Sequence, residues 1–290
     1  MIVVAGPTAS GKTGFAIELA QTLDAPILSA DSRQVYRELN IGVAKPTPDE
    51  LAAAEHHLIS YVGIDEAYSA GRWARDAEHT LEVCFRDHDT CIIAGGSGLH
   101  VRALLEGIPD MPAVPPQTRA HYTALFEAEG LASLQAELRE RDPAYAAVVD
   151  MSNPHRLQRA LAVIAASGQT FTSLRARPHA PLPYRTHWVL LDPERESLYA
   201  RIDARAETMF AAGLVEEARG LSPKRDLDAL QTIGYRELWP HVDGEATRAE
   251  ALAAVQRATR HYARRQLTWN RRLGGLRLRE PDAAAVLTAI

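Results

Sequence analysis

Short runs of consecutive apolar residues alternate along the chain with longer stretches in which apolar residues recur every three or four positions. The first run, Ile2–Ala5, precedes a glycine-rich turn and a helical pattern of about ten residues that begins at Lys12. Similar strand-like runs occur at Pro26–Ala30, Thr90–Ala94 and Trp188–Leu191. Parallel strands separated by helices need crossover connections, so the pattern predicts an α/β fold with an open parallel sheet.

Two proline-rich segments, Pro109–Pro116 and Pro178–Pro183, interrupt this alternation. Between them, from Gln117 to about Ser167, the apolar residues follow a helical spacing and no strand pattern occurs. We therefore expect a helical insertion domain at residues 113–183, inside an α/β core made of residues 1–112 and 184–290.

The composition is that of an ordinary globular protein, with 46% hydrophobic and 24% charged residues. No stretch approaches the roughly 18 consecutive apolar residues that a membrane span needs, and the first strand begins at Ile2. We expect no membrane partner and a soluble, cytoplasmic protein. Cys84 and Cys91 have no metal-binding spacing, and both are expected to be reduced thiols of the core.

The net charge hides a strongly basic segment near the end of the chain. Lys and Arg number 32 against 37 Asp and Glu, for a formal charge of -5. Between Val255 and Arg279, however, there are eight arginines and no acidic residue. In a helix, Arg257, Arg260, Arg264 and Arg271 share one face. Such a stripe is either a solvated surface or a site for nucleic-acid phosphates, and the lack of neutralising acids favours phosphates.

The turn after the first strand carries the clearest chemical motif. Gly6-Pro7-Thr8-Ala9-Ser10-Gly11-Lys12-Thr13 matches the P-loop pattern and stands between a strand and a helix, as that motif requires. Backbone N–H groups of such a loop bind phosphate, the lysine adds a positive charge, and the Thr13 hydroxyl can ligate Mg²⁺. A P-loop by itself favours a kinase or an NTPase.

Three other segments carry residues that could have a function. Asp31 follows the second strand, where it can serve as a catalytic base, a Mg²⁺ ligand or simply an N-cap. Gly95-Gly96-Ser97-Gly98 ends the third strand with backbone small enough for a ligand to approach closely. His56-His57 resembles a pair of metal ligands, but no partner has useful spacing, so a structural role is expected.

Taken together and in order, eight segments resemble the tRNA dimethylallyltransferase family, also called tRNA isopentenyltransferases, over nearly the whole chain. The segments are GPTASGKT at 6–13, DSRQVY at 31–36, IGVAKP at 41–46, HHLIS at 56–60, GGSGLH at 95–100, NPHRLQRAL at 153–161, QTIGYRE at 231–237 and TRHYARRQLTW at 259–269. The departures are modest: Ser97 stands for the usual threonine, His100 for a tyrosine, Ser60 for an aspartate and Ala162 for a glutamate.

The resemblance implies a P-loop NTPase-like core and a prenyl transfer from dimethylallyl diphosphate to N6 of the adenosine on the 3′ side of the tRNA anticodon. This reaction would release diphosphate. The alternative function is that of a P-loop small-molecule or nucleoside kinase that uses ATP. The exocyclic amine is a poor nucleophile, so Asp31 is expected to accept its proton. The P-loop residues Gly6, Pro7, Thr8, Ala9, Ser10, Gly11, Lys12 and Thr13 would bind diphosphate, with Mg²⁺ on Thr13. Ser97 and Arg205 are further catalytic candidates by the same resemblance.

The tRNA partner is expected at six places along the chain, and the target adenine would have to leave the anticodon-loop stack. By resemblance, Ser32 and Gln34 would read that base. The complete set of expected tRNA-binding residues is Asp31, Ser32, Arg33, Gln34, Ser97, Arg119, His155, Arg156, Leu157, Gln158, Arg159, Gln231, Thr232, Ile233, Gly234, Tyr235, Arg236, Arg260 and Arg264. We expect the enzyme to be a monomer.

Overall fold

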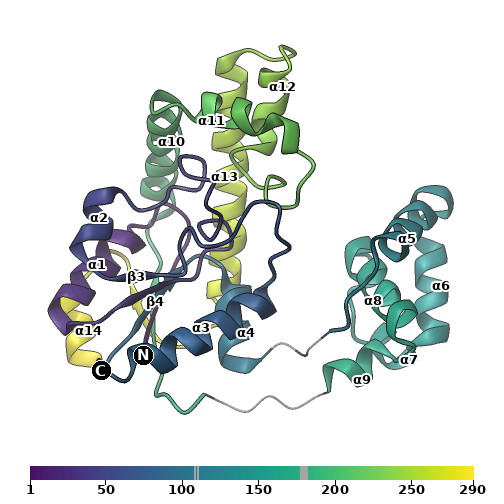
Figure 1. Ribbon diagram of the computed structural model, residues 1–290, viewed down its shortest axis with the longest axis horizontal. Coiled ribbons are helices and arrows are strands. Elements are labelled where there is room, and N and C mark those ends of the chain that lie inside the picture. Colours follow the sequence, from purple (N-terminus) through teal and green to yellow (C-terminus); the bar gives the residue numbers. More distant parts are fainter. Residues whose placement is uncertain (108, 110, 177–181) are drawn as a thin grey trace. The chain divides into compact units, whose positions relative to one another are not determined.

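The computed structural model describes residues 1–107, 109, 111–176 and 182–290. Asp110 of the first proline-rich segment and residues 178–181 of the second lie outside the described residues. The chain forms two compact units: a core unit of Met1–Leu105 with Leu182–Ile290, and a helical unit of Glu106–Pro181 (Figure 1). The helical unit contains nearly all of the segment that the sequence marks as an insertion.

The core unit is built on a parallel sheet of six strands in the order β3-β2-β4-β1-β5-β6. The strands are β1 (Ile2–Ala5), β2 (Ile27–Ser29), β3 (His56–His57), β4 (Ile92–Gly95), β5 (His187–Leu191) and β6 (Leu276–Leu278). The predicted parallel sheet is thus confirmed. The two edge strands were missed, because β3 has only two residues and β6 lies within the basic segment.

Helices cover both faces of this sheet, as the period-two alternation of strand side chains requires. Ile2 and Val4 of β1 pack with α1 (Lys12–Leu23) and α14 (Ala283–Ala289), whereas Val3 packs on the other face with α3 (Ala70–Cys84) and α4 (Gly98–Glu106). The remaining helical segments of the core unit are α2 (Pro48–Ala53), α10 (Arg195–Ala211), α11 (Leu214–Leu221), η1 (Ser222–Lys224), η2 (Arg236–Leu238), α12 (Trp239–Val242) and α13 (Arg248–Asn270).

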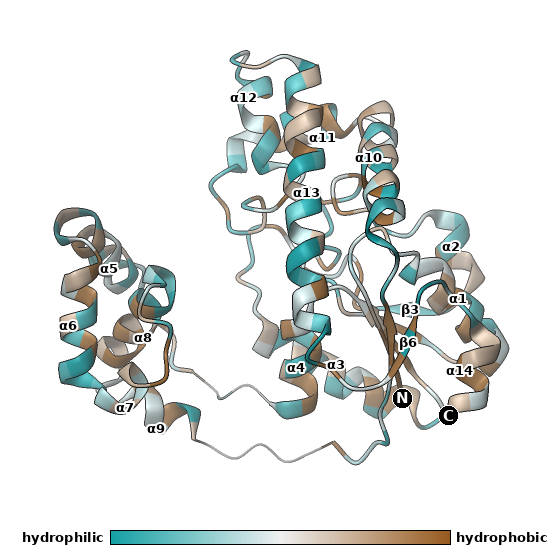
Figure 2. Ribbon diagram, turned by 180° about the vertical axis from the view of Figure 1, so that it is seen from behind, coloured by the Kyte–Doolittle hydropathy of each residue, from teal (hydrophilic) through white to brown (hydrophobic). Residues whose placement is uncertain are grey.

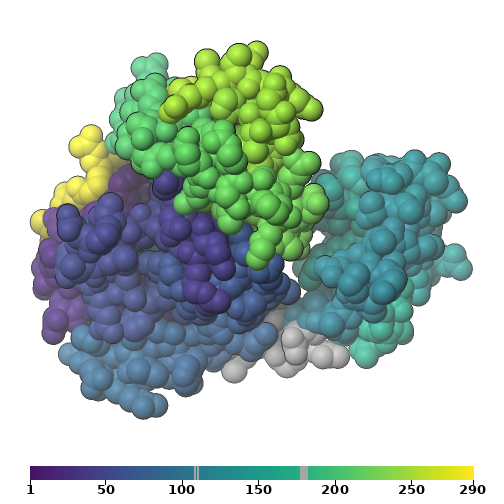
Figure 3. Space-filling view, turned by 45° about the horizontal axis from the view of Figure 1, so that its top comes forward, coloured from purple at the N-terminus to yellow at the C-terminus, as the bar shows by residue number. Residues whose placement is uncertain are grey.

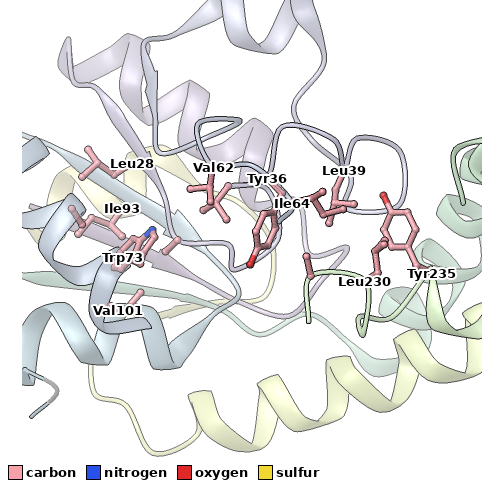
Figure 4. Close-up of a cluster of buried hydrophobic side chains, with 14 of the residues drawn as sticks. Leu28, Tyr36, Leu39, Val62, Ile64, Trp73, Ile93, Val101, Leu230 and Tyr235 are labelled. Atoms are coloured by element: carbon pink, nitrogen blue, oxygen red, sulfur yellow. The ribbon is translucent and has the colours of Figure 1, made fainter. Parts of the chain in front are cut away.

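The larger apolar cluster of the core unit extends from the sheet into the loop that follows β2. Trp73 is fully buried beneath β2, and its indole N–H donates to the Ser29 carbonyl at 3.0 Å. Figure 4 shows the cluster continuing through Tyr36 and Leu39 to Leu230 and Tyr235. This packing joins the loop after β2 to a segment about 200 residues later in the chain, and so fixes the loops that form the site.

The helical unit has its own core. Its elements are α5 (Pro116–Glu129), α6 (Leu131–Arg141), α7 (Pro143–Ala146), α8 (Pro154–Ser167) and α9 (Phe171–Arg175). Leu134, Leu138 and Leu161 are completely buried within it. The Asn153 side chain caps α8 by accepting from the Arg156 N–H, with Pro154 in the first turn. This capping explains the Asn-Pro pair at the start of the NPHRLQRAL segment.

Both cysteines are free and buried, as expected. Burial raises the pKa of Cys91 to about 12 and raises the pKa of Cys84 as well, so neither thiol is a ready nucleophile. None of the described helices combines the length and the apolar character that crossing a membrane requires.

Candidate functional site

The P-loop adopts a conformation suited to binding an anion. Ala9 (φ 62°) and Gly11 (φ 89°) lie in the left-handed region, a feature of backbone turns whose N–H groups form a concave anion site. The Ser10 hydroxyl is buried and has no hydrogen-bond partner among the described residues. An unsatisfied hydroxyl inside such a loop costs stability unless a ligand supplies the partner.

Lys12 is placed where its charge can respond to a ligand. Its ammonium group donates to the Pro7 carbonyl at 2.6 Å. Burial, reinforced by the charge of Arg205 and opposed by Asp31, lowers the pKa of Lys12 to about 7. A phosphate in the loop would favour the charged lysine.

Two cavities open beside the P-loop. The P-loop cavity, of about 390 Å³, is lined by residues Thr8–Gly14 together with Gln34, Gly95, Gly96 and Arg201. The second cavity, of about 320 Å³, is lined by Ser32, Arg33, the loop at 231–236 and one face of α13. The two cavities share Thr8, Asp31, Val43, Ala44 and Arg205. A molecule in one cavity therefore meets a molecule in the other at Asp31 and Arg205.

Asp31 has the structural role that its position suggested, because its carboxylate caps the turn that follows β2. Its Oδ1 accepts from the backbone N–H groups of Arg33 (2.8 Å) and Gln34 (3.3 Å), so the carboxylate caps the turn after β2. Within the described part of the chain, no hydrogen bond uses Oδ2. The turn holds the carboxylate in one orientation and leaves an oxygen for a ligand.

Arg205, from α10, reaches the same point. Its guanidinium donates to the Thr8 hydroxyl. Burial lowers the pKa of Arg205, while the nearby charge of Asp31 opposes that shift. A cation thus lies between the P-loop and the candidate base, where charge on a departing diphosphate would develop.

Ser97 is half-buried beside the P-loop cavity, although it does not line it. Its hydroxyl makes a 2.7 Å hydrogen bond with His100 Nδ1, and its backbone N–H donates to the Ala30 carbonyl. Burial, followed by the charge of Arg33, lowers the pKa of His100 to about 4, so the ring is neutral near pH 7. His100, which stands where the family usually has tyrosine, therefore fixes the orientation of the Ser97 hydroxyl.

The glycines of the loop after β4 leave space that other parts of the protein fill. A Cβ at Gly95 would collide with the Ala30 backbone, one at Gly96 with Gln266, and one at Gly98 with Trp269. The space beside these glycines is occupied by the protein itself, not by a ligand. The backbone of Gly95 and Gly96 nevertheless lines the P-loop cavity, so the expected approach of a ligand to this backbone stays a prediction.

Of the loop at 231–236, Gln231, Thr232, Ile233, Gly234 and Arg236 line the second cavity. Tyr235 is the exception, because its side chain is fully buried and its hydroxyl donates to Glu217 at 2.5 Å. Glu217 also accepts from the backbone N–H groups of Asn40, Ile41 and Gly42. The expected contact of the Tyr235 side chain with tRNA is thus corrected: Tyr235 anchors the loop at residues 40–44, which contributes Val43 and Ala44 to both cavities.

Figure 3 shows the surface where this contact lies. Green atoms of the segment that contains α11 touch purple atoms of the N-terminal part of the core unit there.

Two of the residues that are expected to bind tRNA, Gln34 and Arg33, make hydrogen bonds within the protein. Gln34 accepts from the Ser29 hydroxyl and donates to the carbonyls of Val43 and Ala44, so its amide braces the 40–44 loop. Arg33 donates to the Asp228 carbonyl at 3.0 Å. Ser32, by contrast, lines the second cavity and has no such restraint among the hydrogen bonds of the described residues.

Most of the basic segment that begins at Val255 lies in α13, which Figure 2 shows as a long helix with many hydrophilic segments. From α13, Val255, Thr259, Tyr262 and Arg265 line the second cavity, and the last three are three positions apart. Arg260 instead forms an ion pair with Asp203 of α10, and Arg264 donates to His261. The assumption that no acid neutralises this stripe is therefore wrong at Arg260. Sequence reasoning missed Tyr262, although the helical spacing of 259, 262 and 265 carried the signal.

The remaining expected tRNA contacts lie in the helical unit. Arg119, His155, Arg156 and Arg159 are exposed, and Gln158 donates to the Tyr122 carbonyl at 3.3 Å. Leu157 is completely buried in the core of that unit. Its side chain therefore stabilises α8 and cannot be a contact for RNA, which corrects that assignment.

The structural interpretation of His56-His57 is confirmed. His56 Nδ1 bonds with the Ala54 carbonyl, and His57 Nε2 lies 3.0 Å from Glu55 and 3.6 Å from the Cys84 sulfur. In the part of the chain that the structure describes, no group of three or more His, Cys, Asp or Glu side chains is arranged to hold a metal ion.

Comparison with known proteins identifies the family. The model of the IPP transferase family matches residues 34–273. This chain belongs to the IPP transferase family. A tRNA dimethylallyltransferase 1 from Phocaeicola vulgatus is 41% identical to it over 272 residues, which are 94% of this chain and 91% of the relative. A tRNA dimethylallyltransferase from Cytophaga hutchinsonii is 42% identical over 269 residues, with coverages of 93% and 88%.

A solved IPP transferase supports the same conclusion. The full-length tRNA isopentenylpyrophosphate transferase from Bacillus halodurans has a TM-score of 0.69 and 32% identity, over 96% of this chain and 88% of that one. The resemblance inferred from the eight segments and the P-loop NTPase-like fold are thereby confirmed. The P-loop kinase alternative is not favoured, because the family is matched along most of the chain.

Proposed function

We propose that this protein transfers the dimethylallyl group of dimethylallyl diphosphate to N6 of the adenosine on the 3′ side of the tRNA anticodon and releases diphosphate. The observation that carries the proposal is the pair of cavities that meet at Asp31 and Arg205. A kinase needs a site for its phosphoryl acceptor beside the P-loop. A kinase could use the carboxylate between the two cavities to take a proton from an acceptor hydroxyl, so the match to the IPP transferase family is what favours prenyl transfer over phosphoryl transfer.

The P-loop cavity would hold the diphosphate of the donor. Backbone N–H groups of the P-loop and the Lys12 ammonium group bind its oxygens, and the buried Ser10 hydroxyl gains a partner. The Thr8 N–H is not among these groups, because it donates to Gln266. As the C–O bond breaks, negative charge grows on the diphosphate, and Lys12 and Arg205 stabilise it. The P-loop thus stabilises a leaving group, and no phosphoryl group is transferred.

The acceptor adenine would enter the second cavity as an extruded base. Asp31 accepts the proton of the exocyclic amine while the C–N bond forms, with its carboxylate held by the turn after β2. By the same proposal Ser97 contributes to stabilising charge on the leaving group, with its hydroxyl hydrogen-bonded to His100. Tyr262 and Arg265 supply a ring and a cation to the wall of the base site.

The chain also offers oxygen ligands of the kind that Mg²⁺ prefers, because the Thr13 hydroxyl and the Asp31 carboxylate line the same cavity. Thr13 would be the first ligand, and the bound ion would neutralise charge on the diphosphate. Residues in both units would bind the RNA backbone, among them Arg119, Arg156 and Arg159. We propose that the enzyme acts as a monomer, in the cytoplasm where its tRNA substrate is found.

The test is to follow labels. Dimethylallyl diphosphate labelled in the prenyl group, or ATP labelled in the γ-phosphate, is incubated with the enzyme, with and without unmodified tRNA. We expect the prenyl label to enter RNA and to map to the adenosine beside the anticodon, while ATP is left intact. Transfer of the γ-phosphate to an acceptor would establish the kinase instead. RNA binding without turnover of either donor would refute both enzymatic proposals.

A further inference from the structure

A single buried amide joins α13 to the P-loop and to the loop after β4. Gln266 of α13 is only 7% exposed. Its Oε1 accepts from the backbone N–H of Thr8 in the P-loop at 2.8 Å, and its Nε2 donates to the Gly96 carbonyl after β4 at 2.9 Å. One side chain thereby satisfies two backbone groups from loops that are nearly 90 residues apart in sequence.

The backbone around Gln266 is shaped to accept it. Gly96 has no Cβ, and adding one would collide with the Gln266 amide. One helical turn later, Trp269 fills the corresponding space beside Gly98. Ala263, on the same helix, is completely buried against α10, and Ala9 of the P-loop packs against this group. The contact between α13 and the phosphate-binding loops therefore involves several residues, so a displacement of α13 would be passed on to these loops.

The same helix also forms a wall of the second cavity. Thr259, Tyr262 and Arg265 line it, and Arg265 is the residue directly before Gln266. A helix is stiff over one or two turns, so a ligand that presses on Tyr262 and Arg265 must also shift or restrain Gln266. Gln266 in turn holds Thr8, whose hydroxyl accepts from Arg205 and which lines both cavities.

We propose that Gln266 is a positioning residue that couples the two cavities, so that RNA in the second cavity orders the P-loop and tightens its hold on diphosphate. The inference rests on the proposed function, since it assigns RNA to one cavity and diphosphate to the other. By linkage, diphosphate must then tighten RNA binding by the same factor. Gln266 touches neither ligand and acts through the Thr8 N–H and the Gly96 carbonyl.

The experiment measures this coupling in the whole protein. The affinity for inorganic diphosphate with Mg²⁺ is measured by calorimetry, in the absence and in the presence of saturating unmodified anticodon stem-loop RNA. In the wild type we expect the RNA to tighten diphosphate binding by about tenfold, within the usual range of coupling between sites. In Gln266→Met both hydrogen bonds are lost, and we expect the ratio to fall to about one.

Two further variants separate coupling from folding. Gln266→Glu keeps an acceptor for the Thr8 N–H but loses the donor to Gly96, so an intermediate ratio is expected. Gln256→Met is the matched control, because Gln256 lies on the same helix and donates only to the Asp203 carbonyl. It should keep the wild-type ratio. Because each ratio compares one variant with itself, a general loss of folded protein cancels.

The outcomes are distinguishable. A wild-type ratio near one, or a full wild-type ratio in Gln266→Met, overturns the coupling. If Gln266→Met does not fold, the ratio in Gln266→Glu decides: a wild-type value overturns the proposal and a reduced value supports it. Prenyl transfer by the wild type is measured in parallel. Its absence would sink the proposed function, whereas transfer without coupling would sink this inference alone.

Discussion

At the scale of single residues, the site depends on groups whose environment is set by neighbours that do no chemistry. Asp31 is oriented by two backbone N–H groups, and Ser97 by the neutral ring of His100. Lys12 is held by the Pro7 carbonyl and has a pKa lowered to about 7. Each of these arrangements can be tested by a single substitution or by pH.

Replacing Asp31 by asparagine keeps the shape and an oxygen that can cap the turn, but removes the base. We expect the single-turnover rate of prenyl transfer to fall by about 10²-fold or more, with RNA affinity nearly unchanged. Rapid-quench measurements at saturating tRNA give that rate. Ser32→Ala, at the neighbouring position on the cavity wall, is the control and should lose far less. An undiminished chemical step in Asp31→Asn would exclude Asp31 as the base.

Lys12 predicts a pH dependence of diphosphate binding. In the free enzyme the lysine loses its proton at about pH 7, and a bound anion raises its pKa, so binding takes up a proton above pH 7. The affinity should therefore fall as pH rises above 7, by up to about tenfold per pH unit, until the pKa of the complex is reached. Diphosphate binding to Lys12→Ala, measured over the same pH range, is the control, because it shows the part of the pH dependence that comes from titration of diphosphate itself. Equal slopes for the two proteins would contradict the shift.

At the scale of elements, α13 does three things with three faces. Arg260 pairs with α10, Gln266 and Trp269 pack on the loops after β1 and β4, and Thr259, Tyr262 and Arg265 face the second cavity. Helical periodicity alone indicated an arginine stripe. Which arginine is neutralised depends on α10, which lies about 50 residues earlier in the chain.

The arginines of α13 should accordingly differ in their effect on salt dependence. Arg265→Ala removes an exposed cation at the cavity, and we expect the log–log salt slope of tRNA binding to fall by about 0.7 to 0.9. Arg260→Ala should change that slope much less, because Asp203 already neutralises the charge. Both slopes are measured by filter binding between low and moderate salt. A larger effect at Arg260 would mean that the ion pair with Asp203 opens on RNA.

At the scale of the whole molecule, the strands at the centre of the sheet and the P-loop were predictable from sequence. Val3 and Ile93 lie in short apolar runs that end in glycine, and such runs are a strong local signal. The second cavity was less predictable, because Tyr262 and Ala44 meet there only through long-range packing. Glu217 gives no local signal at all, since its four hydrogen bonds go to residues 40–42 and to Tyr235.

The helical unit gives a further prediction. Arg156 and Arg159 are exposed on α8, three positions apart, whereas Leu157 is buried between them. The double variant Arg156→Ala/Arg159→Ala should weaken tRNA binding and lower the salt slope by about 1.5, with little change in the single-turnover rate at saturating RNA. Arg139, at the end of α6, offers a control position on the same unit. Unchanged affinity and slope would remove α8 from the RNA-binding surface.

The position of β1 in the sheet has a consequence for synthesis of the protein on the ribosome. β1 is made first, yet it lies between β4 and β5, and its partner β5 begins only at His187. One edge of the earliest strand therefore has no partner until the whole helical unit has been translated. Glu106–Pro181, by contrast, is contiguous and can fold as soon as it emerges. The nascent chain must keep an apolar strand edge from pairing wrongly while its inserted unit folds first.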